Sequence, residues 1–284
     1  FNRVTVALSS SSTDYDAFMT GAYMVWQYAP PGWMEDLTPW IENPAVTSPD
    51  YDFDDIIDNI AAGLRWNLED GAPIGEGPQW ALPWGFEGNT LMYNKVVFEE
   101  LGLELPETLD DVIEIGQVIQ AETDMIPIAV RGTRSWATIH PGFMTAYNSA
   151  GAEDYDADMN PQMNSDIAVR FTEKWVEMVS EVGPPEWTSY TWYDVGNSLG
   201  AESAAMIYDA DILGFFQNQE GASDAAGDLA WAAAPPGLDE PATTPNMWIW
   251  SIAMNSYSES KGPAWYWLQW ATSKEFLTTA AVEH

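Results

Sequence analysis

The chain has 284 residues, and its 44 acidic residues against nine Lys and Arg give a formal net charge of −35. Such a surface repels phosphate backbones and anionic membranes, which excludes nucleic-acid binding. Cysteine is absent, which excludes disulfides, thiolate metal sites and cysteine nucleophiles. No stretch approaches the roughly 20 apolar residues of a membrane span.

The acidic residues are spread along the chain rather than gathered in a tail, and only four lysines are present. An acidic interaction protein is one explanation. The other is adaptation to molar salt, where self-repulsion is screened within roughly 3 Å. The even spread favours the second explanation and predicts a salt-loving source organism.

Hydrophobic periodicity predicts alternating strands and helices along the chain. The strands are expected at 4–8, 15–19, 126–130, 204–208 and 248–254. The helices are expected at 52–66, 108–123 with Thr108 as N-cap, 166–182 and 262–276. The alternation indicates an α/β fold with largely parallel sheets, and the length favours two domains or one large one.

Most sequence signatures of catalysis are absent. His140 and His284 are the only histidines, so neither a histidine metal cluster nor an HExxH motif can form. Nucleophile-elbow and phosphate-binding glycine motifs are missing too. The two carboxylates of a glycoside hydrolase stay possible, because 44 acids offer many pairs and none is informative. We predict no enzymatic activity and no cofactor.

Residues 154–165 imitate a calcium-binding loop. Acidic or amide side chains stand at alternate positions, namely Asp154, Asp156, Asp158 and Asn160. The loop lacks the glycine and the final glutamate that calcium loops need, since Met159 and Ser165 stand there. We therefore predict no metal and regard the segment as a solvated acidic loop, with calcium left open.

Tryptophan is unusually frequent, with 16 residues in the chain. Indole faces stack on the C–H faces of sugars, and nearby carboxylates, amides and arginines bind the hydroxyls. Loops that combine both groups therefore predict a sugar or polyol site. The candidate ligand-binding residues are Tyr23, Trp26, Trp84, Glu87, Arg134, Trp136, Trp192, Asp209, Asp211, Trp248 and Trp250.

Several of these residue types have a purely structural alternative. Tryptophans within helix-like stretches are expected to be packing residues: Trp66, Trp175, Trp265, Trp267 and Trp270. Arg131 and Arg134 either form ion pairs with the acidic surface or donate hydrogen bonds to a ligand. His140 is either a core histidine or a ligand contact.

Four segments resemble the extracellular solute-binding proteins of ABC importers, in the large family that binds sugars and polyols. They are residues 15–41, 82–112, 201–216 and 248–276. The second contains the crossing strand "LPWGFEGNTLMYNK", and the third resembles a Gly-Lys-Ala-Ala-Met motif in which Glu202-Ser203 replaces Gly-Lys. The segments occur in the family's order.

The resemblance implies a periplasmic-binding-protein-like fold of two α/β lobes, a hinge and an interlobe ligand cleft. Lobe 1 is expected at 1–84 and 248–284, and lobe 2 at 85–247. Tyr23, Glu87 and Asp209 fall on loops that commonly touch ligand in this family. Family members have further elements before residue 1 and after residue 284, so we expect truncation at both ends.

The function that the resemblance implies is capture of a sugar or sugar alcohol by lobe closure and its delivery to ABC permease subunits. It further implies a monomer, located outside the cell and lipid-anchored through an upstream segment. Two rival interpretations are a glycoside hydrolase, which would show turnover, and a carbohydrate-binding surface module, which would prefer polymers.

Overall fold

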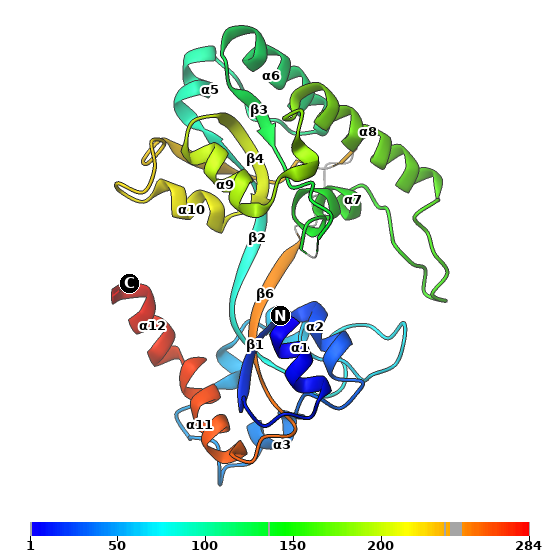
Figure 1. The fold of residues 1–284 in the computed structure, drawn as a ribbon, viewed down its shortest axis with the longest axis vertical. Helices are drawn as coiled ribbons and strands as arrows, with labels where there is room; N and C mark the ends of the chain where they lie inside the picture. The colour runs from blue at the N-terminus through cyan, green and yellow to red at the C-terminus, as the bar shows by residue number, and fades with distance from the viewer. Residues whose placement is uncertain (1, 136, 236, 239–245, 284) are drawn as a thin grey trace. The chain divides into compact units, whose positions relative to one another are not determined.

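The computed structural model describes residues 2–135, 137–235, 237–238 and 246–283 (Figure 1). The chain divides into two compact units. Unit 1 contains Phe1–Phe86 and Trp248–His284, and unit 2 contains Glu87–Met247. Two strands therefore run from one unit into the other, β2 (Leu82–Asn94) and β6 (Met247–Met254). The boundaries implied by the resemblance were 84/85 and 247/248.

Unit 2 is built on a mixed sheet in the order β5, β2, β4, β3. Its other strands are β3 (Ile126–Ala129), β4 (Ala204–Ala210) and β5 (Leu229–Ala232). Among the pairings of the described strands in this sheet, only β3–β4 is parallel, and β2 is antiparallel to both β4 and β5. The expectation of largely parallel sheets was therefore wrong, because the crossing strand enters the sheet against the direction of its neighbours.

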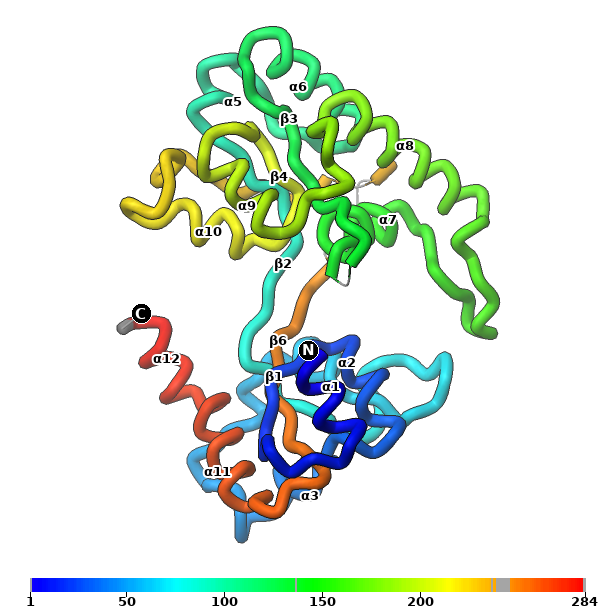
Figure 2. Tube along the Cα trace, in the orientation of Figure 1, coloured from blue at the N-terminus to red at the C-terminus, as the bar shows by residue number. Residues whose placement is uncertain are grey.

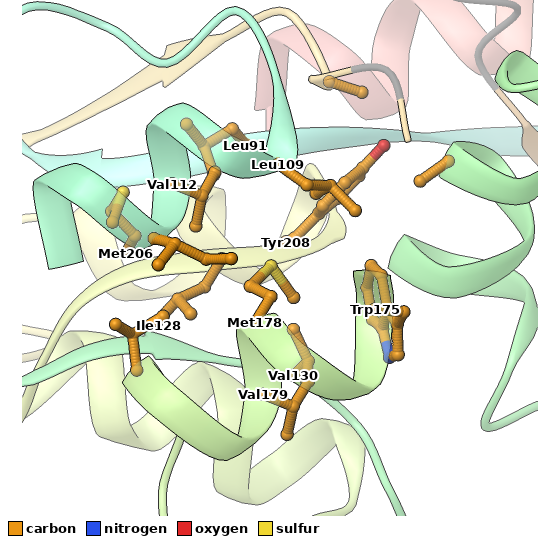
Figure 3. Close-up of a cluster of buried hydrophobic side chains, with 14 of the residues drawn as sticks. Leu91, Leu109, Val112, Ile128, Val130, Trp175, Met178, Val179, Met206 and Tyr208 are labelled. Carbon is orange, nitrogen blue, oxygen red and sulfur yellow. The ribbon is translucent and has the colours of Figure 1, made fainter. Parts of the chain in front are cut away.

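Helices cover both faces of this sheet. Residues of α6 (Leu109–Glu122), α7 (Thr145–Ser149) and α8 (Asp166–Val182) share one core cluster with Leu91, Ile128 and Tyr208. Figure 3 shows this cluster, with Tyr208 of β4 between the sheet and the helices. The opposite face packs against α9 (Trp192–Gly200) and α10 (Ile212–Asn218) through Met92 and Ile207. A side chain's face is thus read from its parity along the strand.

Local capping explains where the helices of unit 2 begin. Thr108 and Asp111 form a reciprocal capping box at the start of α6, with hydrogen bonds of 3.1 and 2.8 Å. Ser165 caps α8, whose bounds are those predicted from the sequence. Asn94 caps α5 (Lys95–Leu101), and Gly102 ends it at a φ of 64°.

Unit 1 pairs β1 (Ala17–Gly21) with β6 in antiparallel register, with Gly21 opposite Trp250. One face of this pair packs against α1 (Asn2–Ser9), α2 (Ala22–Tyr28) and α4 (Asp58–Ala62). The other face packs against α11 (Lys261–Ala271), which is followed by α12 (Lys274–Glu283). The short helices are α3 (Thr38–Ile41), η1 (Phe53–Asp55), η2 (His140–Met144) and η3 (Trp187–Ser189). Figure 2 follows the trace through each unit.

Three predicted elements of unit 1 differ from the structure. Residues 4–8 form helix α1 instead of a strand, because a helix places Val4 and Leu8 together against the core of unit 1. The helix expected at 52–66 shrinks to η1 and α4, which ends before Gly63. The helix expected at 262–276 ends at Ala271 and restarts at Lys274 as α12.

The tryptophans expected to be packing residues divide into two groups. Trp66, Trp175 and Trp265 are buried, as predicted. Trp267 and Trp270 are 42% and 50% exposed, so the prediction was wrong for these two. Helical periodicity explains the difference, since Trp265, Leu268 and Ala271 of α11 face the core, whereas Trp267 and Trp270 lie three residues apart on the outward side.

The acidic loop at 154–165 satisfies its own polar groups. Asp156 accepts hydrogen bonds from the main-chain N–H groups of Asp158 and Asn160 and from the amide of Gln162. Among the described residues, no group of three or more acidic or histidine side chains is arranged to hold a metal ion. Within the same residues, no helix is long and apolar enough to cross a membrane.

Candidate functional site

Three aromatic side chains gather at one edge of unit 1. We call Tyr23, Trp248 and Trp250 the aromatic cluster. The ring centroids of Tyr23 and Trp248 are 5.1 Å apart, and those of Trp248 and Trp250 are 5.5 Å apart at an interplanar angle of 75°. These distances are typical of favourable ring contacts. The cluster therefore forms an apolar wall where β1 ends and β6 begins.

Gly21 makes room for this wall. A Cβ at Gly21 would lie 2.7 Å from Cη2 of Trp248, closer than any real contact. The Trp248 indole thus rests directly on the main chain of β1, and its exposed fraction is only 8%. Burial, with a smaller effect from Tyr28, raises the pKa of Tyr23 to about 12. The phenol therefore stays protonated at neutral pH and can donate a hydrogen bond.

Two other predicted aromatics of unit 1 are more open. Trp26 on α2 is 53% exposed, and Trp84 on β2 is 39% exposed. Large exposed aromatic faces are available to a ligand without prior rearrangement. Neither indole belongs to the aromatic cluster. The predicted tryptophans of unit 1 thus form two groups, the clustered pair on β6 and two separate, exposed side chains.

Unit 2 brings its predicted polar residues to one edge of its sheet. Because β3 and β4 are parallel, the residues that follow both strands lie at the same edge, which is where open α/β sheets bind ligands. Antiparallel β2 enters the sheet there. We call the residues at this edge the polar edge: Glu87, Asn89, Arg131, His140, Asp209, Asp211 and Asn246.

An ion pair between Arg131 and Asp209 lies at the centre of the polar edge. Nε and Nη2 of Arg131 donate to the two carboxylate oxygens at 2.8 and 2.5 Å, and Nη1 donates to the Ala137 carbonyl at 2.7 Å. Asp209 is fully buried. Burial raises the pKa of Asp209, and the charge and hydrogen bonds of Arg131 oppose this rise. The bidentate geometry is that of an ionised pair.

This geometry corrects the expectation for Asp209 and decides between the alternatives for Arg131. Asp209 was expected on a ligand-touching loop, yet it is buried and both oxygens are held by Arg131. Arg131 is the ion-pairing arginine, whereas Arg134 is exposed. Asp209 therefore positions the guanidinium of Arg131 and does not offer its own oxygens to a ligand. Trp136, another predicted contact, lies outside the described residues.

The first turn of α9 stands at the same edge. Gly196 lies against Leu213, and Gly200 lies against Gln217. Helices α9 and α10 therefore run in the same direction, and both begin at this edge. Trp192, the first residue of α9, is 39% exposed. Asp194 belongs to the capping box of this helix, where it accepts hydrogen bonds from Thr191. Asp194 therefore has a structural role at the start of this helix.

The loop that carries Arg131 is fastened to the segment before α9. The main-chain N–H groups of Gly132 and Thr133 both donate to the Tyr190 carbonyl at 3.1 Å. Any side chain at Gly132 would collide with Trp187, whose main chain and ring lie against it. The positions of Arg131 and Trp192 are therefore coupled through this contact.

Glu87 and Asp211 supply the accessible carboxylates of the polar edge. Both are partly buried, and burial raises the pKa of Asp211. The main-chain N–H of Asp211 donates to the Gly88 carbonyl at 2.8 Å. A Cβ at Gly88 would lie 3.7 Å from Oδ2 of Asp211, so the carboxylate stands beside the β2 main chain one residue after Glu87.

Asn89, which pairs with Asn246, was not predicted from the sequence as a site residue. Nδ2 of Asn89 and Nδ2 of Asn246 both donate to the His140 carbonyl, at 3.3 and 3.2 Å. The Asn89 N–H also donates to the Asn246 carbonyl at 3.2 Å. The available signal was a polar residue at an inward position of an apolar strand, since Asn89 shares the face of Leu91.

His140 is a largely buried histidine at the start of η2. Burial, with a smaller effect from Arg131, lowers the pKa of its imidazole from 6.5 to about 4. The ring is therefore neutral at physiological pH, and the polar edge carries no additional positive charge there. Burial and the neutral ring favour the alternative that His140 is a core histidine.

Acidification should destabilise the protein through His140. Between pH 6.5 and about 4, the unfolded chain binds a proton that the folded protein excludes, so the unfolding free energy falls as the pH falls through this window. We expect urea midpoints at pH 7.5 and 4.5 to differ less in His140→Gln than in the unmodified protein. Equal differences in the two proteins would contradict this assignment.

The chain matches a known protein family and three informative relatives. It is 45% identical to an erythritol/L-threitol-binding protein of Mycolicibacterium smegmatis over 99% of this chain and 60% of that protein. It is 24% identical to a mannitol-binding protein of Pseudomonas aeruginosa over 96% of this chain and 60% of that protein. The chain therefore spans about 60% of the length of these curated relatives.

A solved structure supports the same fold. An ABC transporter solute-binding protein from Agrobacterium vitis S4, with bound D-mannitol, superposes with a TM-score of 0.81 at 26% identity, covering 99% of this chain and 65% of that one. The family described as bacterial extracellular solute-binding proteins matches residues 1–276. The two-lobed α/β fold expected from the resemblance is confirmed, and the chain belongs to the bacterial extracellular solute-binding protein family.

Proposed function

We propose that this chain is the ligand-binding part of an ABC importer's solute-binding subunit and that its ligand is a small acyclic polyol. The observation that carries the proposal is the 45% identity to an erythritol/L-threitol-binding protein across 99% of this chain. The family consists of binding proteins, so we propose capture and release without chemical change. Delivery to ABC permease subunits forms part of the same proposal.

The electrostatics of the polar edge support a neutral ligand. Arg131 is neutralised by Asp209, His140 is uncharged at physiological pH, and the whole chain carries a net charge of −35. An anionic ligand would be repelled by this field. A polyol offers hydroxyl donors to Glu87 and Asp211 without adding charge.

The aromatic cluster supports a ligand with apolar C–H groups. Tyr23, Trp248 and Trp250 form a wall of mutually contacting rings, which restricts their side-chain freedom before any ligand contact. Open-chain polyols present C–H groups along their length and hydroxyls around them. They therefore suit an aromatic wall.

We expect Trp84→Ala and Glu87→Ala each to weaken polyol binding about tenfold or more, the loss typical of a ligand-contacting residue. The measurement is isothermal titration calorimetry with erythritol and L-threitol. Trp267→Ala is a matched control, because Trp267 is 42% exposed and Trp84 is 39% exposed, yet Trp267 lies on α11. Equal losses in Trp84→Ala and Trp267→Ala would remove Trp84 from the site.

Location, anchoring, oligomeric state and the remaining ligand contacts are predictions. The family is described as extracellular, and lipid anchoring, a monomeric state and a salt-loving source are expected from the sequence alone. Trp26, Arg134, Trp136 and Trp192 are retained as proposed ligand contacts. A glycoside hydrolase or a polymer-binding surface module would require turnover or preference for polysaccharides, and the family match favours neither.

A further inference from the structure

Asn89 holds a buried oxygen that lacks a hydrogen-bond donor. The side chain is 1% exposed, and its Nδ2 donates to the His140 carbonyl at 3.3 Å and to Oγ1 of Thr145 at 3.1 Å. Its Oδ1 has no partner among the described residues. A buried acceptor left unpaired is costly, and such groups in native proteins usually receive a water or a ligand.

The orientation of this amide is determined by its neighbours. Oγ1 of Thr145 donates to the His140 carbonyl at 3.5 Å, so the hydroxyl is available to Asn89 as an acceptor. Exchanging Oδ1 and Nδ2 would place the oxygen against the His140 carbonyl and leave that contact repulsive. The free atom of Asn89 is therefore the oxygen, and it requires a donor.

Asn89 also lies within the polar edge. It stands two residues after Glu87 on β2 and pairs in register with Ala210, between Asp209 and Asp211. Its main chain is held by Asn246, and its side chain by η2 and α7. The side chain that carries the unpaired oxygen is thus held rigidly at the polar edge.

We infer that Asn89 is a specificity-determining residue whose Oδ1 accepts a hydrogen bond from one hydroxyl of the bound polyol. The inference rests on the proposed function and assigns one of the ligand's hydroxyl groups to a named acceptor. A neutral donor suits this position, because a cation would meet Arg131 nearby and a carboxylate ligand has no proton to donate. A ligand that lacks this hydroxyl leaves the buried oxygen unpaired and binds more weakly.

The test is a thermodynamic cycle in which the Asn89 side chain and one hydroxyl of the ligand are removed separately and together. Affinities are measured by calorimetry on the complete protein. Erythritol is compared with the two triols that lack either one terminal or one secondary hydroxyl. We expect the unmodified protein to bind one triol about tenfold more weakly. Asn89→Ala should bind erythritol about tenfold more weakly and show no further loss with that triol.

Two variants separate ligand contact from a structural role. Thr145→Val removes one acceptor of Nδ2 but leaves Oδ1 in place. This variant should therefore still bind the triol more weakly than erythritol. Ser251→Ala removes another buried oxygen that lacks a partner among the described residues, in β6 of unit 1. It should also bind the triol more weakly than erythritol. If Asn89→Ala discriminates between erythritol and the triol as strongly as the unmodified protein does, the inference is wrong, and the oxygen binds a trapped water instead of the ligand.

A second measurement requires no variant. The ¹³Cγ resonance of Asn89 should shift downfield when the unmodified protein is saturated with erythritol, because its oxygen then accepts a hydrogen bond. No shift on saturation overturns the inference while leaving the proposed function intact. If the unmodified protein binds neither erythritol nor threitol nor a longer polyol, the proposed function itself fails, and the inference fails with it.

Discussion

Asp209→Ala should lower the free energy of unfolding by roughly 3–5 kcal/mol, the cost of removing one partner from a buried ion pair. Arg131, whose side chain is only 10% exposed, would keep its charge without the carboxylate that now holds it at two positions. The measurement is urea unfolding at neutral pH, followed separately by tryptophan fluorescence and circular dichroism.

Two controls define this result. Lys274→Ala breaks an ion pair with Asp55 whose side chains are 67% and 44% exposed, so no measurable loss is expected. The double variant Arg131→Met with Asp209→Leu removes both charges and should recover much of the loss, because an apolar pair avoids the desolvation cost. A loss in Asp209→Ala as small as that in Lys274→Ala would show that the pair is not buried.

Gly21→Ala should disturb the aromatic cluster without removing any aromatic atom. The added methyl would lie 2.7 Å from Cη2 of Trp248, so the indole must move. Overpacking of this kind costs roughly 1–3 kcal/mol. We expect a lower urea midpoint, a changed tryptophan emission spectrum and polyol binding weakened by about tenfold or more, since the wall formed with Tyr23 and Trp250 is lost.

The matched control is Gly262→Ala, the same chemical change in helix α11. A Cβ at Gly262 meets nothing within 4 Å, and alanine favours a helix over glycine by roughly 0.5–1 kcal/mol. This variant should therefore be neutral or slightly more stable and should bind polyol normally. If Gly21→Ala behaves in the same way, the contact between β1 and Trp248 does not shape the site.

The elements predicted best from the sequence are those with local signals. The apolar spacing and Ser165 cap of α8 and the Thr108 capping box of α6 depend on residues within a few positions of each other. The buried strands β3 and β4 are compact apolar runs with clear boundaries. Local physics is sufficient for these segments, and tertiary packing agrees with it.

The failures share a different cause. Residues 4–8 are rich in β-branched side chains, but packing of Val4 and Leu8 against unit 1 decides for a helix. The direction of β2 relative to β4 depends on residues more than 100 positions apart. No pattern within either segment contains that information.

The candidate site shows the same division. Residue types indicated a sugar or polyol site, because aromatic and acidic side chains share loops. The partners did not follow from the sequence: Asp209 is 78 positions from Arg131, and Asn89 is 51 positions from His140. The roles of Asp209 and Asn89 depend on these distant contacts, which only the fold brings together.

Calorimetric titration of the complete protein tests directly whether this chain binds small acyclic polyols. Erythritol, L-threitol, ribitol and mannitol should be compared with glucose, maltose and a soluble polysaccharide under the same salt conditions. We expect saturable binding of at least one polyol, tighter than that of any ring sugar, with no consumption of ligand. Binding only to ring sugars or polysaccharide, or turnover of a glycoside, would contradict it.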